Sequence, residues 1–225
     1  MYDRFMRIKS AFALLLVVPM LWTNMAHAAT SCSNLVALTI QDAKIASATQ
    51  VPAGAFAPPG ANGAPSSNLP AFCRVVAIAK PSTDSLINLE VWIPAASSWN
   101  GKFQGVGNNA FLGSISYAAM ADALRSGYAT ASSDAGHVGG ELDFAQGHPE
   151  KAVDWSYRSA HITAEVGKLI VRNVQGRWPQ RSYFTGCDTG GHQALMEAQR
   201  YPDDYDGIVA GVPAADRVPE IIGYL

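Results

Sequence analysis

Residues 183–192 of the chain read YFTGCDTGGH, and this stretch decides the fold. Its leading aromatic and β-branched residues are typical of a short buried strand, and the small residues behind them allow a tight turn. Residues 193–199 (QALMEAQ) then continue with good helix formers. The stretch predicts a strand, a sharp Gly-x-X-x-Gly turn and a helix, with the middle side chain of the turn raised above the end of the strand.

The residue in the middle of that turn is Asp188. The same strand–turn–helix unit forms the nucleophile elbow of α/β-hydrolases, where a serine esterase carries its attacking serine. The first N–H groups of the helix point at the same place and stabilise negative charge there, so Thr189 is a candidate oxyanion donor. The sequence therefore predicts an esterase scaffold with a carboxylate where the attacking hydroxyl is expected.

A second oxyanion donor is expected in the loop that follows an earlier strand, residues 102–107. In hydrolases of this fold, a loop of small residues at this place supplies one backbone N–H. The loop here begins Asn108-Asn109-Ala110, and Asn109 and Ala110 are the candidate donors.

The composition fits one globular domain and argues against nucleic acid as a partner. The 225 residues are 48% hydrophobic and 15% charged, with a formal net charge of −2. No basic stripe is present, so the electrostatic footprint of a nucleic-acid-binding protein is missing from the sequence.

The first 28 residues have the pattern of a secretory signal peptide. Three basic residues (Arg4, Arg7 and Lys9) precede an apolar run at 11–22, and Ala26-His27-Ala28 is a small-x-small cleavage site. A membrane anchor is the alternative, but the apolar run is shorter than the roughly 20 residues that a spanning helix needs. We expect a secreted or periplasmic protein with one domain at 29–225 and no membrane association after cleavage.

The chain has three cysteines, Cys32, Cys73 and Cys187. Export implies an oxidising compartment in which cysteines tend to pair, and a Cys32–Cys73 bridge would tie down the start of the domain. Cys187 is then left unpaired beside the elbow residue. No Cys-x-x-Cys motif or Cys/His cluster is present, so neither zinc nor another cofactor is expected.

Strand-like and helix-like segments alternate along the rest of the chain. Strands are expected near 35–40 (a weak signal), at 74–79, at 86–94 with one buried face, at 102–107, at 127–134, at 183–187 and, fully buried, at 208–212; helices are expected at 117–124, at 157–174 and behind the elbow; residues 52–70 and 138–156 are expected to be loops. This order predicts the α/β class, with a mostly parallel sheet and helices on both faces.

The sequence resembles the tannase/feruloyl esterase family of secreted α/β-hydrolases. The stretches that carry the resemblance are WNGKF (99–103), SDAGH (133–137), GHPEK (147–151) and, above all, residues 183–214. The resemblance implies hydrolysis of aromatic esters, of galloyl or feruloyl type. It also implies a Cys-Ser pair at the elbow, an Asp and a His-Cys pair much later, a bond between the two cysteines, and an intervening lid that often binds calcium.

The chain departs from that pattern in three ways. Asp188 stands where the family has serine, and the matching residues cover only the N-terminal part of the family's fold, before the lid, the Asp and the His-Cys pair. The loop at 107–110 reads Gly-Asn-Asn-Ala, where the family is richer in glycine. Under this resemblance, Cys187 is the elbow cysteine without its partner.

Three functions are therefore open. The first is a carboxylic ester hydrolase for aromatic esters that is inactive or very weak in this chain, because the nucleophile and the base are missing. The second is a hydrolase that uses Asp188 as a nucleophile on alkyl halides or epoxides. It still needs a histidine base, and none of His137, His148, His161 and His192 follows a late strand as that fold requires.

The third function is non-enzymatic, a truncated pseudoenzyme or binding module. In that case the strand at 208–212 would be an uncovered sheet edge, and self-association through it is expected. Asp203, Asp204 and Asp206 are read as a solvated turn, because they lack the glycine and the distal glutamate of a calcium loop. Asp134 and His137 are read as residues that fix a loop beside the site.

Overall fold

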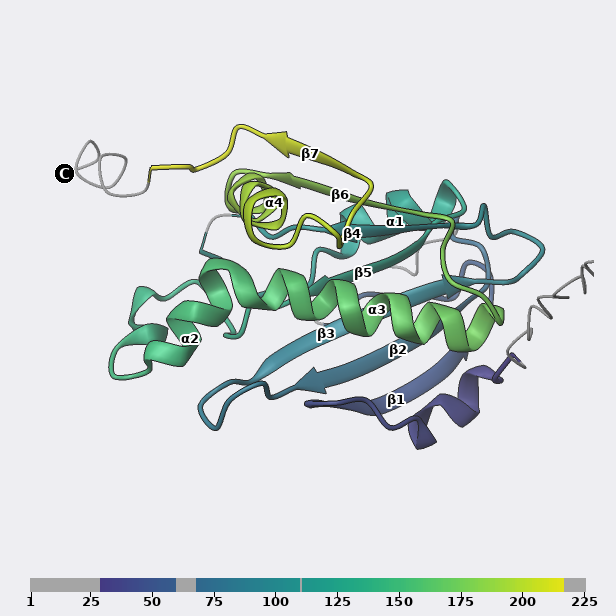
Figure 1. The fold of residues 1–225 in the computed structure, drawn as a ribbon. Coiled ribbons are helices and arrows are strands. Elements are labelled where there is room, and N and C mark those ends of the chain that lie inside the picture. Colours follow the sequence, from purple (N-terminus) through teal and green to yellow (C-terminus); the bar gives the residue numbers. More distant parts are fainter. Residues whose placement is uncertain (1–28, 60–67, 110, 217–225) are drawn as a thin grey trace, which may run out of the picture.

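The computed structural model describes residues 29–59, 68–109 and 111–216 (Figure 1). The expected signal peptide at 1–28 and the candidate donor Ala110 lie outside these residues. The elements in chain order are a 3-10 turn at Cys32–Ala37, β1 (Ala43–Val51), β2 (Phe72–Ala79), β3 (Ile87–Pro94), β4 (Lys102–Val106), α1 (Tyr117–Arg125), β5 (Ala129–Ser133), a 3-10 turn at Leu142–Ala145, α2 (Pro149–Val153), a π-helical turn at Asp154–Arg158, α3 (Ser159–Gln175), β6 (Arg181–Cys187), α4 (Thr189–Arg200) and β7 (Gly207–Gly211).

The described strands form one mixed sheet in the order β1-β2-β3-β5-β4-β6-β7. Strands β1, β2, β3 and β5 pair antiparallel, whereas β5, β4, β6 and β7 pair parallel. The α/β-hydrolase-like sheet with flanking helices is thus confirmed, and antiparallel pairing is confined to its N-terminal half. The carboxyl ends of the parallel strands meet at one edge of the sheet, which is where ligands bind in folds of this kind.

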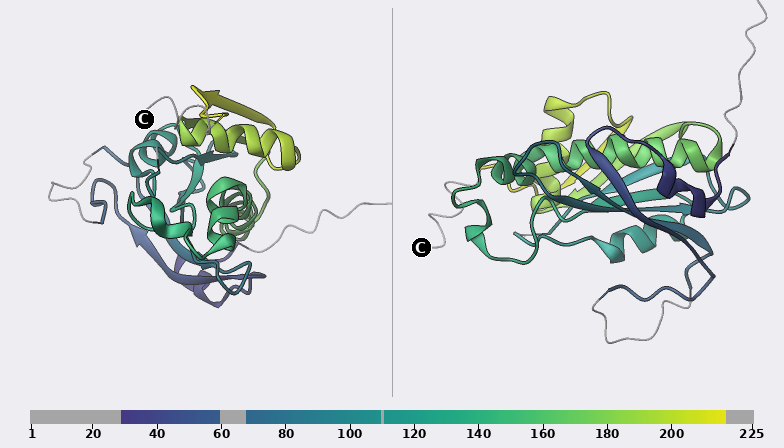
Figure 2. Two further views of the ribbon diagram at one scale, coloured as in Figure 1. Left: turned by 90° about the vertical axis from the view of Figure 1, so that its left-hand side faces the viewer. Right: turned by 90° about the horizontal axis from the view of Figure 1, so that it is seen from below.

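Helices cover the sheet on both faces (Figures 1 and 2). On one face, α3 buries Ile170 and Val171 in a core that includes Leu89, Val91 and Phe103. On the other face, α1 packs against a second core whose largest members are Phe72, Trp92, Met120 and Leu124. Each such side chain contributes about 1.5–3 kcal/mol through the apolar area that it removes from water.

Strand β3 is buried on both faces, which corrects the expectation of one buried face. Its alternating pattern places Glu90 on the second face, yet this side chain is only 4% exposed. The carboxylate accepts hydrogen bonds from the Arg74 guanidinium, from the Trp92 indole N–H at 2.9 Å and from the Tyr117 hydroxyl at 2.9 Å. A buried charge with this many donors is tolerated, so a polar residue in the pattern does not mark a solvent face here.

Three other expectations are wrong in detail. The weak strand signal near 35–40 corresponds to the 3-10 turn at Cys32–Ala37, where Leu35 is fully buried and Cys32 is bonded to β2. The segment expected as a loop at 138–156 contains the short helix α2 and the π-helical turn that continues into α3. Strand β7 was expected to be fully buried, but it is the last strand of the described sheet and its Val209 is 63% exposed.

The predicted disulfide between Cys32 and Cys73 is confirmed, and it joins the start of the domain to β2. Cys187 is an exposed free thiol. Among the described residues, no helix has both the length and the apolar character needed to cross a membrane.

Candidate active site

The turn between β6 and α4 has the conformation that the sequence predicts. Asp188 has φ +57° and ψ −114°, a left-handed backbone that costs an L-residue about 1–2 kcal/mol. Three hydrogen bonds hold it there. The Asp188 N–H donates to the Gly211 carbonyl at 3.0 Å, and its own carbonyl accepts from the N–H groups of His192 (2.9 Å) and Ala214 (3.3 Å). The strain is therefore imposed by β7 and α4 together.

The glycines of the motif are required by close backbone contacts. A Cβ atom on Gly186 would lie 2.2 Å from the Gly190 carbonyl oxygen, and one on Gly191 would lie 2.4 Å from the Gly211 carbonyl oxygen. One on Gly190 would lie 2.8 Å from the Asn108 carbonyl oxygen. Strand, helix and the neighbouring loop thus approach one another at distances that only glycine allows.

The loop after β4 lies against the start of α4, as the oxyanion hypothesis requires. The Gly190 N–H donates to the Asn108 carbonyl at 2.7 Å, and the Gly107 N–H donates to the Thr185 carbonyl at 2.9 Å. The Thr189 side chain is fully buried, whereas Asn109 is exposed beside the elbow. The roles of Thr189 and Asn109 as oxyanion donors stay predictions.

Two buried amides lock this loop to the elbow helix, and sequence reasoning missed both. The Asn108 N–H donates to Oε1 of Gln193, and the Gln193 amide donates to Oδ1 of Asn108. The Asn108 amide also donates to the carbonyl oxygens of Ser114 (2.9 Å) and Ser133 (2.8 Å). Their only sequence signal was a polar residue directly after a strand and another in the first turn of an otherwise apolar helix face.

A cavity of about 600 Å³ opens beside the elbow. Its wall is formed by the start of α1 and by the ends of β6 and β7, with Leu112, Ile115, Tyr117, Cys187 and Val209 among the lining residues. The lining mixes these apolar side chains with polar ones, among them Asn109, Ser114, Ser116 and Thr185. Burial, together with the Glu90 carboxylate, raises the pKa of Tyr117 well above its ordinary value, so this hydroxyl stays protonated.

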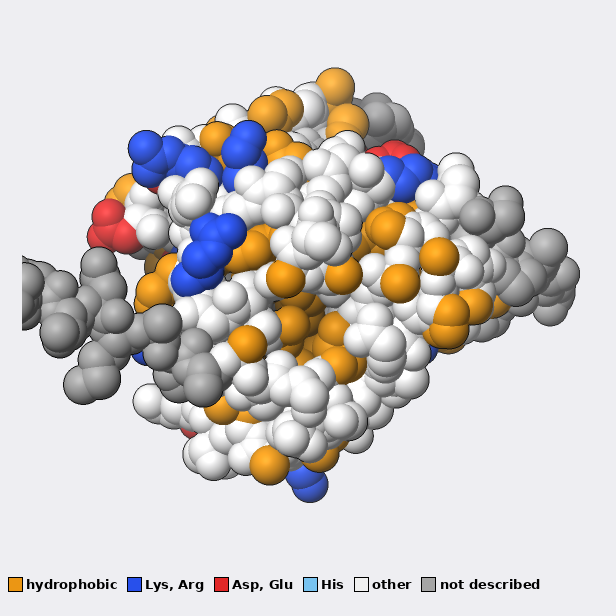
Figure 3. Space-filling model, turned by 90° about the vertical axis from the view of Figure 1, so that its right-hand side faces the viewer, with side chains coloured by type: hydrophobic (Ala, Val, Ile, Leu, Met, Phe, Trp, Pro, Cys, Tyr) orange, Lys and Arg blue, Asp and Glu red, His pale blue; other side chains and the backbone are white. Residues whose placement is uncertain are grey.

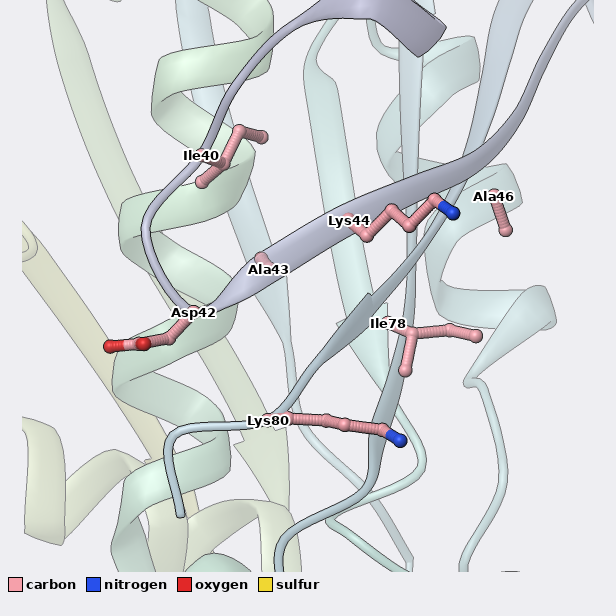
Figure 4. A pocket seen from close by; sticks show the side chains of 7 residues that line it. All are labelled: Ile40, Asp42, Ala43, Lys44, Ala46, Ile78 and Lys80. Carbon is pink, nitrogen blue, oxygen red and sulfur yellow. The ribbon is translucent and has the colours of Figure 1, made fainter. Parts of the chain in front are cut away.

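A larger groove of about 700 Å³ lies on β1 and β2, at the opposite side of the strand order from β7 (Figure 4). In Figure 4 the side chains of Lys44 and Lys80 extend to the same side of this groove, and Asp42 points to the other side. None of the elbow residues lines it.

Each histidine among the described residues has a partner other than the elbow carboxylate. The rings of His137 and His192 contact the carbonyl oxygens of Phe111 (2.8 Å) and Ser156 (3.2 Å). His148 pairs with Asp84 at 2.8 Å, and His161 pairs with Asp204 at 2.6 Å.

Asp134 fixes a loop, as the sequence suggested. It accepts the Asn88 N–H (3.0 Å) and the Gly136 N–H (2.9 Å), together with the Asn88 side-chain amide. Burial raises the pKa of Asp134, against the effect of these donors.

The Trp155 ring stacks on both Phe111 (5.5 Å between centroids) and His192 (6.4 Å), so the loop after β4 and α4 share one aromatic stack.

The aspartates at 203–206 lie in a turn behind the elbow helix. Asp204 binds His161 and Lys168, and Asp206 accepts the Ser182 N–H at 2.7 Å. In the part of the chain that the structure describes, no group of three or more potential ligands is arranged to hold a metal ion.

A buried carboxyl group lies next to this turn. Glu197 of α4 is fully buried, and burial followed by the nearby Asp204 raises its pKa to about 9, so it is protonated at neutral pH. The pKa of Asp204 is lowered, since its hydrogen bond with His161 and the charge of Lys168 outweigh its own burial.

Comparison with known proteins agrees with this geometry. The family described as "Tannase and feruloyl esterase" matches residues 73–222. An uncharacterized esterase of Xanthomonas campestris pv. campestris is 45% identical over 202 residues, which are 89% of this chain and 34% of the relative. A protein of Aspergillus fumigatus named "Probable feruloyl esterase B-1" is 36% identical over 186 residues, 80% of this chain and 35% of the relative.

The fold has a solved counterpart as well. The crystal structure of feruloyl esterase B from Aspergillus oryzae aligns with a TM-score of 0.74 and 35% identity, over 81% of this chain and 36% of that protein. The chain thus spans about a third of the length of the relatives that it matches. On the family match, the sequence identities and the structural alignment, this chain belongs to the tannase and feruloyl esterase family.

Proposed function

We propose that this protein is related in function to enzymes that hydrolyse aromatic esters of feruloyl or galloyl type. Because Asp188 stands at the elbow, the protein itself hydrolyses such esters very weakly or not at all. The observation that carries the proposal is the position of Asp188 at the apex of the β6–α4 turn, with φ +57°. The family match and relatives named as feruloyl esterases support the ligand class.

The chemistry of a carboxylate explains why ester hydrolysis is expected to be absent or very weak. Attack on an ester carbonyl by Asp188 would give a tetrahedral adduct with two leaving groups, the carboxylate and the alkoxide. The carboxylate is the much weaker base and leaves first, so the adduct returns to the intact ester. A carboxylate at this place also repels the oxyanion that the start of α4 would otherwise stabilise.

A non-catalytic binding role for the same cleft is the second candidate, and it too is favoured by Asp188. Attack by Asp188 on an alkyl halide or epoxide has less support, because the resulting ester needs a histidine to activate water. The described histidine rings contact other partners, including the Phe111 and Ser156 carbonyls.

Ligand binding and turnover test the proposal separately. The chain is titrated with methyl ferulate, methyl gallate and, as a non-aromatic control, methyl cyclohexanecarboxylate, while released acid is measured over hours. We expect saturable binding of the aromatic esters without turnover. Leu112→Arg, at the cleft, should weaken that binding, and Val138→Arg, at an exposed site outside the cleft lining, should not. Equal affinity for the cyclohexane ester would contradict the aromatic ligand class.

Asp188→Ser, assayed in the same way, separates two causes of the absent turnover. A gain of turnover would show that Asp188 alone prevents hydrolysis and that a histidine of this chain acts as the base. No gain would show that a base beside the elbow is lacking.

We also propose that the protein is exported and that its signal peptide is cleaved after residue 28. The Cys32–Cys73 disulfide supports an oxidising destination, secreted or periplasmic. Mass spectrometry of the mature protein tests this, because an N-terminus at residue 29 is expected and an uncleaved chain would contradict it.

Self-association through the open edge of β7 is a further part of the proposal. Among the described residues β7 pairs with β6 alone, and Val209 of β7 and the following Val212 are 63% and 82% exposed; an unpaired strand edge can recruit another strand. Light scattering over a range of concentrations should show dimers or larger species that Val209→Lys reduces. A monomer at every concentration would count against it.

A further inference from the structure

The end of the molecule opposite the elbow carries a cluster of cations among aromatic rings (Figure 3). Three loops, with the ends of the elements they join, meet there at the amino ends of β4, β5 and β6: residues 95–102, 125–128 and 172–183; the turn before β7, with Asp203, Asp204 and Asp206, adjoins them. Together the three loops contain five Lys and Arg residues and no Asp or Glu, in a chain with 16 basic and 18 acidic residues. Figure 3 shows lysine and arginine side chains gathered over the upper part of this end, beside a hollow with hydrophobic side chains.

Hydrogen bonds hold the three loops together as one surface. The Asn100 N–H donates to the Gly127 carbonyl at 2.9 Å, and the Gln180 N–H donates to the Gly101 carbonyl at 2.8 Å. The Asn100 side chain also donates to the Ser126 carbonyl at 2.9 Å. The charged groups are therefore carried on a fixed frame.

Three of the five cations lie over aromatic rings. The Arg172 guanidinium is 4.9 Å from the Trp178 ring centroid, and the Arg177 guanidinium is 4.5 Å from that of Trp99. The Lys102 ammonium lies 5.9 Å from the Tyr128 ring and 6.0 Å from the Tyr183 ring. Stacking orders these side chains without neutralising them, so their charge stays available to a ligand.

The other two cations are paired with acids, one within helix α1 and one in the turn before β7. Arg125 binds Asp122, and Arg181 binds Asp206 at 3.0 Å. Counting these two acids, the three loops have a net charge of 5 − 2 = +3, although the whole chain has −2; the adjoining turn adds Asp203, and its Asp204 is paired with Lys168 and His161. The loops form a local positive surface on an acidic protein.

Trp178 adds a flat apolar face. It is 50% exposed although Arg172 lies over its ring, so ring surface remains open to solvent. A pyranose ring presents C–H groups that pack on an indole face, and a carboxylate on that sugar pairs with a guanidinium beside it. A polymer with one charge per sugar is also less densely charged than duplex DNA, which carries a charge every 1.7 Å or so, and it therefore suits an overall acidic protein better.

We propose that this surface, defined by Lys102, Arg172, Arg177 and Trp178, binds an acidic polysaccharide whose sugars carry carboxylates. It would hold the protein on such a polymer through the end opposite the elbow, and it does not depend on Asp188 or on ester hydrolysis.

The test is binding of the whole chain to polygalacturonate, with dextran as the neutral control, at several salt concentrations. We expect salt-sensitive binding to polygalacturonate alone. Trp178→Ala should lower the affinity about tenfold, which corresponds to 1.4 kcal/mol. Trp178→Phe, which keeps a flat ring, should restore most of it. Arg172→Gln combined with Lys102→Gln should remove most of the salt-sensitive part.

Lys44→Gln with Lys80→Gln is the matched control, because it removes two lysines from the β1–β2 groove of Figure 4. Thermal unfolding of each variant shows whether it is folded. The proposal is overturned if polygalacturonate does not bind, or if the control pair lowers the affinity as much as the variants at the surface. It is also overturned if duplex DNA or vesicles containing phosphatidylglycerol bind equally well and Trp178→Ala has no effect.

Discussion

Asn108 and Gln193 are joined by two hydrogen bonds, from the Asn108 N–H to Oε1 of Gln193 at 3.0 Å and from the Gln193 amide to Oδ1 of Asn108 at 2.9 Å. The two side chains are 3% and 1% exposed. The pair fixes the distance between the loop after β4 and the N-terminal part of α4. It therefore sets how the predicted oxyanion donors of the loop and of the helix lie relative to each other.

Gln193→Leu should destabilise the protein by about 1–3 kcal/mol, because the Asn108 N–H and carbonyl Oδ1 would be left buried without a partner. The free energy of unfolding, measured with urea, checks this. Gln50→Leu on the exposed side of β1 is the matched control and should change it by less than about 0.5 kcal/mol. If both variants change the free energy of unfolding equally, the Asn108–Gln193 pair does not stabilise the contact between the loop and α4.

Gly186→Ala should prevent the elbow from forming, because the new Cβ would lie 2.2 Å from the Gly190 carbonyl oxygen. We expect a loss of about 3 kcal/mol or more in unfolding free energy, or no soluble protein. Gly211→Ala is the control on the neighbouring strand, since its Cβ would meet atoms at no less than 3.4 Å. A well-folded Gly186→Ala variant would show that the close approach of β6 and α4 is not required.

The free energy of unfolding should fall as pH rises from the ordinary pKa of a glutamate towards the raised pKa of Glu197 in the folded protein. The pKa of Glu197 is about 9 in the folded protein, because of burial and the nearby Asp204, against 4.5 for an ordinary glutamate. Between pH 5 and 9 the folded chain therefore keeps a proton that the unfolded chain has already released near pH 4.5. In that range the folded state loses up to about 1.4 kcal/mol of stability per pH unit from this group.

Glu197→Gln should remove this dependence, so that the difference in unfolding free energy between variant and parent grows from pH 5 to pH 9. Urea unfolding at several pH values measures it. Lys168, His161 and Tyr205 also face the pair of carboxyl groups, and they are the same in both proteins. Glu141→Gln, on an exposed side chain, should give a pH-independent difference. If the unfolding free energies of Glu197→Gln and of the parent change with pH in parallel, Glu197 is not protonated in the folded protein.

Loss of the Cys32–Cys73 disulfide should lower the unfolding free energy by about 2–4 kcal/mol, because the bond closes a loop across 41 positions of sequence separation. The double variant Cys32→Ser with Cys73→Ser, unfolded in urea, measures this. Cys187→Ser is the control and should have little effect, since that thiol is exposed and free. A similar loss in both would show that the bond does not stabilise the domain.

Sequence reasoning located the elbow because glycine spacing is a local signal. Gly186, Gly190 and Gly191 lie against backbone atoms of their neighbours in the fold, so these positions require glycine. The requirement is visible in the motif itself. The parallel strands were also predictable, because short segments bounded by turn residues alternate with helical patterns along the chain. The Cys32–Cys73 bond could be proposed from the compartment alone.

Long-range polar contacts could not be predicted in this way. The sequence predicts one buried face for residues 86–94, because nothing near Glu90 in the sequence indicates its partners Arg74 and Tyr117, which lie 16 and 27 residues away. Asn108 and Gln193 are separated by 85 residues, and each is unremarkable in its own segment. Glu197 appeared only as a helix former, since its pKa depends on burial and on a turn that packs against it in the folded chain.

The central claim is that Asp188 does no nucleophilic work on esters. The most direct test compares the initial rates of the chain as sequenced and of Asp188→Ala on methyl ferulate and methyl gallate. We predict equal rates, both close to the uncatalysed hydrolysis in buffer. Turnover of about 1 s⁻¹ or faster by the chain as sequenced, lost in Asp188→Ala, would contradict it and make Asp188 a working catalytic group.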